Sequence, residues 1–300
     1  MLTYGRPGAS PERFLRDLVP ALEAFPASAE VLVVNNGGAA HRGAVERAIA
    51  ASGIGAVARP VVLDSPANDI AVARNLVLDR ASAPLVAFLD DDEAPVRTWL
   101  VALVDCLERT GADVVAGPVH VEYAGGAAPW LTRTDLHPSR GRLTGERLPF
   151  AGAGNCLVRA RSIGAERFDL RFGRTGGEDT EFFMRLADRG LAIVWCAEAV
   201  AVERASGARG TTRHALRRFL NQGATYRRVL RARGRRASGP AFALRAAALF
   251  AGSLPVAAVL LLLGRPSAGT WLMRAVSNLG KLVGPARSIY APVPAARDDP

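Results

Sequence analysis

Two patterns of apolar residues alternate along the first part of the chain, one typical of helices and one typical of buried strands. Residues 11–25 place them three and four apart, which predicts a helix with one face on a core. Residues 31–34 form an unbroken apolar run, which is typical of a strand buried on both faces. The alternation continues, predicting helices over about 41–51, 69–82 and 95–109 and strands over about 57–63, 85–89 and 112–117. This β-α alternation favours a parallel, doubly wound sheet.

The alternation stops near residue 118. Residues 118–150 mix glycine, proline and charge, and we interpret them as an irregular excursion or an acceptor-side loop. Later apolar runs predict strands over 156–158 and 191–196, a helix from about 178 to 188, and a basic helix over roughly 211–236. Regular structure is therefore expected to return after residue 150, before a basic helix begins.

The C-terminal part is more apolar than the rest. Residues 246–264 are uncharged between Arg245 and Arg265, and this run meets the length needed to span a membrane. Pro255 weakens the prediction of a span. Residues 271–283 carry Arg274 and Lys281 and are expected to form an amphipathic helix.

Composition excludes some classes of protein. The chain has 300 residues, 49% hydrophobic and 22% charged, which fits a folded protein and argues against disorder. The net charge is +10, and the segment from Arg204 to Arg236 contains eleven arginines and no acid. Such a block is suited to phosphates, anionic lipids or nucleic acid.

Cysteine usage and the N-terminus give weaker indications. Cys106, Cys156 and Cys196 are odd in number and lack CxxC spacing, so we expect packed, reduced thiols of an intracellular protein. The first 25 residues lack an apolar signal segment, which favours a cytosolic catalytic part. Only two residues precede Thr3, so we expect either a shortened first strand or a true start further upstream.

Four consecutive acids follow the predicted strand over 85–89: Asp90, Asp91, Asp92 and Glu93. They repel one another unless a cation or several donors lie between them. Ligands of doubly wound sheets bind at the carboxyl ends of strands. Carboxylates plus a diphosphate suit Mg²⁺ or Mn²⁺, and the ion would neutralise a departing diphosphate. The alternative is an acidic cap that complements a helix dipole.

A second acidic cluster opens the predicted helix over 178–188. Gly176 and Gly177 precede Glu178, Asp179 and Glu181. Glycines allow the backbone to pass close to a ligand, and one carboxylate could take a proton from an attacking hydroxyl. The alternative is again helix capping. Two acidic clusters, one for a metal and one for a base, are more informative together.

The remaining candidates are individually weak. Arg74 could reach a phosphate or a base, or be a solvated helical arginine, and Asn35 and Asn36 could bind a base edge or form an ordinary turn. His120, His137 and His214 show no zinc-ligand spacing. The sequence has no GxGxxG after its first strand and no GxxxxGK[ST] motif.

Together these segments resemble family 2 glycosyltransferases of the GT-A fold, particularly bacterial exopolysaccharide glucosyltransferases of the succinoglycan type. The matching segments occur in the family's order over about residues 3–230. They are Thr3-Tyr4-Gly5-Arg6-Pro7, Val33-Val34-Asn35-Asn36, Ala73-Arg74-Asn75, Phe88-Leu89-Asp90-Asp91-Asp92-Glu93, Gly152-Ala153-Gly154-Asn155 and Phe172-Gly173-Arg174-Thr175-Gly176-Gly177-Glu178-Asp179-Thr180-Glu181-Phe182-Phe183. The last two are the most specific.

The resemblance implies a site. It places Thr3, Tyr4, Arg6, Asn36, Arg74, Asp90 and Asp91 around the donor, Asp92 and Asp90 at the metal, and Asp179 with Glu178 at the catalytic base. Asn36 stands where the family usually has an aspartate against uracil. Glu203 stands where relatives place a metal or diphosphate contact. The implied domains are a GT-A catalytic domain with a mixed sheet over 1–203, a basic helical segment over 204–240, and a membrane-associating tail over 241–300.

The resemblance also implies an activity. It is an inverting transfer from a nucleotide-diphosphate sugar, with UDP favoured, to a glycan or polyprenyl-linked acceptor in exopolysaccharide or cell-surface glycan synthesis. The cofactor is Mg²⁺ or Mn²⁺, and the place is the cytoplasmic face of the inner membrane. A basic segment beside an apolar helix supplies two attachment signals.

Three alternatives remain open at this stage. A nucleotidyltransferase uses similar metal and diphosphate chemistry. It usually has a glycine-rich loop with a lysine or arginine after the first strand, and here only Gly5 and Arg6 are available. A non-catalytic binder of anions or nucleic acid would use the arginine block, yet only Phe219 and Tyr226 supply interleaved aromatics. A degenerate transferase, disabled by its short first strand, is the third.

Overall fold

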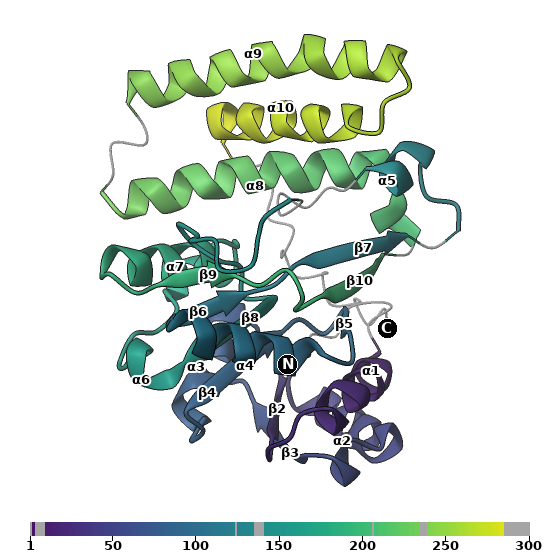
Figure 1. Cartoon of the computed structure of the whole chain (residues 1–300), viewed down its shortest axis with the longest axis vertical. Helices are drawn as coiled ribbons and strands as arrows, with labels where there is room; N and C mark the ends of the chain where they lie inside the picture. Colours follow the sequence, from purple (N-terminus) through teal and green to yellow (C-terminus); the bar gives the residue numbers. More distant parts are fainter. Residues whose placement is uncertain are drawn as a thin grey trace, which may run out of the picture.

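The computed structural model describes residues 2–3, 10–123, 125–134, 141–205, 207–234 and 239–284. An α/β body contains the sheets and the N-terminal helices, and three long helices lie in parallel rows beyond one end of it (Figure 1). The predicted α/β class with a helical C-terminal extension is therefore confirmed.

The N-terminal sheet is parallel, as predicted. Its order is β1-β2-β3, formed by β1 (Leu2–Thr3), β2 (Glu30–Asn35) and β3 (Arg59–Asp64). The helices α1 (Pro11–Glu23) and α2 (Ala39–Ser52) follow β1 and β2 in the chain and pack on each other. The run Val31–Val34 is buried, which explains its lack of polar residues.

The second sheet is mixed, which confirms the mixed sheet implied by the resemblance, whereas the β-α alternation by itself favoured parallel strands. Its order is β4 (Leu85–Leu89), β8 (Asn155–Arg159), β6 (Val114–Ala116) and β9 (Ile193–Trp195). β8 runs antiparallel to both neighbours, whereas β6 and β9 are parallel. The long segment between β6 and β8 returns the chain from the opposite direction, so no helical crossover is needed.

A small third sheet lies beside the second and was not predicted. β10 (Ala201–Ala205) lies between β5 (Glu93–Pro95), to which it is antiparallel, and β7 (Val119–Tyr123), to which it is parallel. β7 and the short helix α5 (Pro129–Arg133) lie in the region expected to be irregular, so that expectation was wrong for this part. The strands are short, and their partners are far away in the chain.

Three helices of the body carry or support the acidic segments. They are α3 (Ile70–Arg80), α4 (Trp99–Thr110) and α7 (Glu178–Asp188), each within a few residues of the predicted range. The short elements η1 (Ile54–Ala56), α6 (Ala160–Ile163), η2 (Leu170–Phe172) and η3 (Gly207–Gly210) complete the body. The three cysteines are free and buried, as expected for packed thiols.

The C-terminal stack consists of α8 (Thr212–Ala232), α9 (Pro240–Leu262) and α10 (Ala268–Val283). α10 lies between α8 and α9, so α9 is the outermost row (Figure 1). Among the described residues, α9 is the one helix long and apolar enough to cross a membrane, and only 17% of its apolar window is buried. The helix continues through Pro255.

α8 and α10 approach each other at backbone distance. A Cβ added to Gly223 would lie 1.8 Å from the carbonyl oxygen of Ser277, and one added to Gly280 would lie 2.0 Å from that of Leu220. Only glycine permits this approach, and small residues serve the same purpose where helices cross closely in membranes.

Candidate donor and metal site

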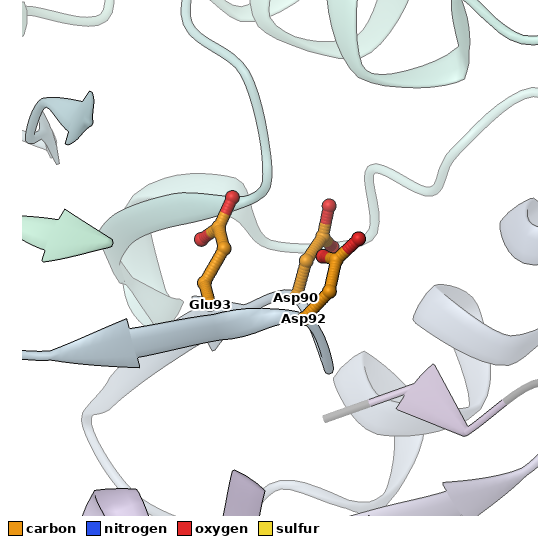
Figure 2. A group of neighbouring side chains, drawn as sticks. All are labelled: Asp90, Asp92 and Glu93. Atoms are coloured by element: carbon orange, nitrogen blue, oxygen red, sulfur yellow. The ribbon is translucent and has the colours of Figure 1, made fainter. Parts of the chain in front are cut away.

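Three carboxylates converge where β4 ends and β5 begins. Asp90, Asp92 and Glu93 can each offer an oxygen within 4.8 Å of the others. The Glu93 amide donates to the Asp90 carbonyl at 3.1 Å, closing a tight turn. All three side chains point to the same side of the ribbon (Figure 2). The buried strand therefore delivers a cluster of hard oxygen ligands to the sheet edge.

Glu93, which the sequence motifs did not assign to the metal, is the most buried of the three carboxylates. Its side chain is 7% exposed, and its Oε2 has no hydrogen-bond partner among the described residues. Burial, followed by the charges of Asp90, Asp92 and Glu203, raises its pKa well above the usual range. A buried carboxylate lacking a partner is unfavourable, so the residues present fit a divalent cation.

Arg74 joins the two acidic clusters. Its side chain is 3% exposed, and it donates to Glu178 Oε1 at 2.5 Å and to Asp90 Oδ1 at 3.2 Å. Burial, followed by the charge of Asp179, raises the pKa of Glu178 to about 7, although Arg74 opposes the shift. The end of β4 and the start of α7 are thus held together by one guanidinium.

A glycine loop runs between the same two clusters. A Cβ on Gly152 would lie 3.6 Å from Asp179 Oδ2, and one on Gly154 would lie 2.9 Å from Glu93 Oε1. Oδ1 of Asp179 already accepts from the Thr180 amide at 2.6 Å. The other oxygen therefore faces the loop, next to the three-carboxylate cluster.

A second guanidinium, that of Arg209, also contacts the cluster. Arg209 donates to Asp92 Oδ2 at 2.5 Å and to Glu203 Oε1 at 3.1 Å, and Arg218 donates to Glu203 Oε2 at 3.2 Å. Glu203 is buried and pairs in register with Glu93 across β5 and β10. Sequence reasoning missed Arg209, since nothing local distinguishes it from the other arginines of the basic segment.

A small pocket of about 60 Å³ adjoins this ion pair network, between the third sheet and α8. Its lining includes Tyr123 and Phe219 as aromatic walls, together with Glu203, Arg209, His214 and Gln222. Burial, followed by the neighbouring Arg218, lowers the pKa of His214. The pocket therefore combines ring faces with hydrogen-bonding groups beside the acidic cluster.

The predicted donor residues near the N-terminal sheet differ in their contacts and in whether the structure describes them. Asn36 is buried, and its Oδ1 accepts from the amide of Asp69, the N-cap of α3. Thr3 pairs in register with Asn35, at the carboxyl edge of β2. Tyr4 and Arg6 lie outside the described residues. Asp91 lies in the turn between Asp90 and Asp92. The donor contacts assigned to these residues stay predictions.

An acidic cluster at the carboxyl edge of an α/β body suits an enzyme that binds a divalent metal and a diphosphate. The chain belongs to glycosyl transferase family 2, whose family model matches residues 2–165. It is by family a glycosyltransferase, which confirms the resemblance noted in the sequence.

Two similar proteins illustrate the relationship. The chain is 32% identical over 223 residues to the succinoglycan biosynthesis protein ExoM of Rhizobium meliloti (strain 1021), covering 73% of this chain and 71% of that protein. It also resembles the crystal structure of GalNAc-T7 with UDP, GalNAc and Mn²⁺, with a TM-score of 0.52 and 15% identity. That match covers 77% of this chain but 46% of the other, and it shows likeness of fold alone.

Proposed function

We propose that the protein transfers a sugar from a nucleotide-diphosphate donor, with UDP favoured, to a hydroxyl of a glycan or polyprenyl-linked acceptor. The observation that carries this proposal is the bridge through Arg74 between the metal-type cluster at Asp90 and the acidic pair at Glu178. A transfer needs a site for diphosphate and a base close together. The solved relative that contains UDP and Mn²⁺ supports the donor class.

Asp92, Asp90 and Glu93 are the residues that would hold Mg²⁺ or Mn²⁺. When bound, the ion supplies positive charge against the leaving diphosphate. The unpartnered, buried Oε2 of Glu93 supports a third ligand beyond the two aspartates expected from the sequence. Glu93 also shapes the site, because its Oε1 lies against the glycine loop.

Asp179 is the proposed catalytic base of an inverting, single-displacement transfer. Its Oδ2 faces the glycine loop, so it can accept the proton of an acceptor hydroxyl while Oδ1 stays bonded to the Thr180 amide. Glu178, also assigned to the base from the sequence, is buried against Arg74. We assign Glu178 the task of holding Arg74, and through it Asp90, in position.

The donor's base and ribose are assigned to the edge of the N-terminal sheet. Thr3, Tyr4, Arg6 and Asn36 form the proposed nucleotide pocket, with Asp91 near the ribose or diphosphate. Arg74, by contrast, has its guanidinium committed to two carboxylates. In this proposal Arg74 stabilises the two acidic clusters and affects binding of the nucleobase only through them.

The acceptor is proposed to approach at a membrane surface. The outer side of α9 is apolar throughout residues 246–264, and Leu254, Val259, Leu262 and Leu263 are exposed. Monomeric soluble proteins rarely expose such a continuous patch. Arg245 and Arg265, both exposed, flank it and suit anionic headgroups. Packing along α10 suits a helix attached at the membrane surface. The proposed location is the cytoplasmic face of the inner membrane.

Intramolecular contacts of the basic segment argue against a nucleic-acid surface. Arg228 donates to the carbonyls of Thr175 and Gly176, Arg233 binds Glu181, and Arg209 binds Asp92. These guanidinium groups are used to dock α8 and to neutralise acids. The name of the relative in succinoglycan biosynthesis supports a role in exopolysaccharide or cell-surface glycan synthesis.

The donor proposal is tested by calorimetric titration of UDP into detergent-solubilised protein, with and without Mn²⁺. Binding should require the metal and should be lost in Asp92→Asn. The matched control is Asp105→Asn, because Asp105 is an exposed acid on α4. Absence of binding by folded wild type, or equal binding by Asp92→Asn, would refute the metal–diphosphate site. Activity with UDP-sugars and lipid-linked acceptors then identifies the sugar.

The membrane proposal is tested by flotation with vesicles that contain anionic lipid. The double variant Leu254→Asp, Val259→Asp should remain in the aqueous fraction. Leu143→Asp serves as the control, since Leu143 is 76% exposed but lies on the α/β body. Flotation of the double variant at the wild-type level would remove α9 as the attachment surface and leave the donor site unaffected.

A further inference from the structure

Arg209 contacts Asp92, a proposed metal ligand, and also lines the neighbouring pocket. It lies on η3, between the end of β10 and the start of α8. Its Nη1 is 2.5 Å from Asp92 Oδ2 and 3.1 Å from Glu203 Oε1. Two carboxylates, one in the turn between β4 and β5 and one on β10, therefore fix the position of this guanidinium.

Glu203 acts as the anchor of this arrangement. It is buried, and its second oxygen accepts from Arg218, so the chain of contacts runs Asp92, Arg209, Glu203, Arg218. The β5–β10 register places Glu203 beside Glu93, close to but separate from the three-carboxylate cluster. Loss of the contact with Asp92 would leave Arg209 paired with Glu203.

A divalent cation and the Arg209 guanidinium compete for Asp92. A cation bound by Asp92 would lie about 2.1 Å from a carboxylate oxygen. The guanidinium is only slightly further from the same carboxylate, so the two positive groups would repel strongly at such short range. The repulsion disappears if an anion with several oxygens lies between them. A diphosphate has that geometry and charge, and arginine binds phosphate oxygens in bidentate fashion.

We propose that Arg209 is the resident cation at Asp92, which metal alone displaces poorly and which binds the donor diphosphate once metal and nucleotide arrive together. This inference rests on the proposed metal–diphosphate function. It makes binding of the metal and of the nucleotide mutually dependent, with Arg209 as the coupling residue. Before the donor binds, Arg209 neutralises the carboxylates of Asp92 and Glu203. After the donor binds, it neutralises the charge of the leaving diphosphate.

The test compares Mn²⁺ affinity with and without saturating UDP, measured by calorimetry and by the electron paramagnetic resonance signal of free Mn²⁺. In Arg209→Gln, Mn²⁺ alone should bind about tenfold more tightly, and the gain in Mn²⁺ affinity caused by UDP should shrink about tenfold or more. Arg213→Gln removes the same charge from an exposed position on α8 and should leave both values at the wild-type level. Arg209→Lys should be intermediate, because lysine keeps the charge but lacks the planar guanidinium that binds phosphate oxygens in bidentate fashion.

Three results decide the matter. Unchanged or weaker binding of Mn²⁺ alone by folded Arg209→Gln, in a series where wild type binds Mn²⁺ and UDP, overturns the role of Arg209 and leaves the proposed function standing. Equal tightening in Arg213→Gln reduces the effect to net charge and overturns it as well. Wild type that binds neither Mn²⁺ nor UDP refutes the proposed function itself. If Arg209→Gln does not fold, Arg209→Lys replaces it and should change both Mn²⁺ affinities in the same direction by a smaller amount.

Discussion

The acidic site and the C-terminal stack are held together by different forces. In the site, buried acids face guanidinium groups, as in the pairs Arg74–Glu178 and Arg209–Glu203. In the stack, α8 and α10 meet backbone to backbone at Gly223 and Gly280, and α9 presents an apolar outer side. Stability of the site should therefore respond to charge and pH, whereas stability of the stack should respond to side-chain volume and to the surrounding solvent.

The two regions share α8. Arg228 donates to the carbonyls of Thr175 and Gly176, directly before the acidic start of α7, and a Cβ on Gly177 would lie 2.5 Å from Thr225 Cγ2. The stack therefore supports the turn that carries the proposed base. The predicted domain boundary at residue 203 stays a prediction. The contacts of Arg228 and Thr225 show that the segments on its two sides pack closely on each other.

The largest expected effect comes from breaking the ion pair that joins the acidic clusters. Arg74→Met leaves the Glu178 carboxylate buried without its partner and should lower the free energy of unfolding by about 3–5 kcal/mol. Urea denaturation at pH 8 measures it. Arg80→Met is the matched control, because Arg80 is exposed on the same helix, and its loss should be small. Similar losses in the two variants would show that the pair contributes little.

A comparable effect is expected from pH. The pKa of Glu178 is raised to about 7 from 4.5, so the folded protein binds this proton more tightly than the unfolded chain. The resulting stabilisation is complete below about pH 4.5 and is lost as pH rises through 7, for a change of about 3 kcal/mol. Unfolding of metal-free wild type and Glu178→Gln should therefore differ in pH dependence over this window. Parallel curves would contradict the raised pKa.

A smaller effect should appear in the stack alone. Gly280→Ala places a methyl group 2.0 Å from the Leu220 carbonyl, and overpacking of this kind costs about 1–3 kcal/mol. Limited proteolysis should cut the stack faster, while UDP binding changes little. Gly252→Ala is the control: its added Cβ has open space on α9, so it should stabilise the helix by roughly 0.5–1 kcal/mol. Loss of UDP binding in Gly280→Ala would mean that the two regions are one cooperative unit.

The smallest effect concerns the charge at the end of α9. Arg265→Gln should weaken binding to anionic vesicles by about 1 kcal/mol, roughly fivefold, and leave binding to neutral vesicles unchanged. Co-sedimentation at low and high salt measures both. Equal weakening for both lipid compositions would assign the contribution of Arg265 to packing instead of to lipid charge.

Local patterns in the sequence were sufficient for the elements and for the acidic candidates. The apolar run of residues 31–34 and the run ending at Leu89 are buried strands, and the helices lie near their predicted ranges. Burial on two faces requires unbroken apolar residues, and acids at the end of such a strand must lie at the sheet edge. The family follows from motifs of the same local kind.

Tertiary structure decided which distant residues meet. Nothing local indicates that β8 runs antiparallel, that β10 inserts between β5 and β7, or that Glu203 therefore lies beside Glu93. The same pairing selects Arg209, among eleven arginines of its segment, as the partner of Asp92. Periodicity reports which face of an element is buried, whereas strand order and ion pairing depend on contacts between residues about 100 positions apart, which arise only when the chain is folded.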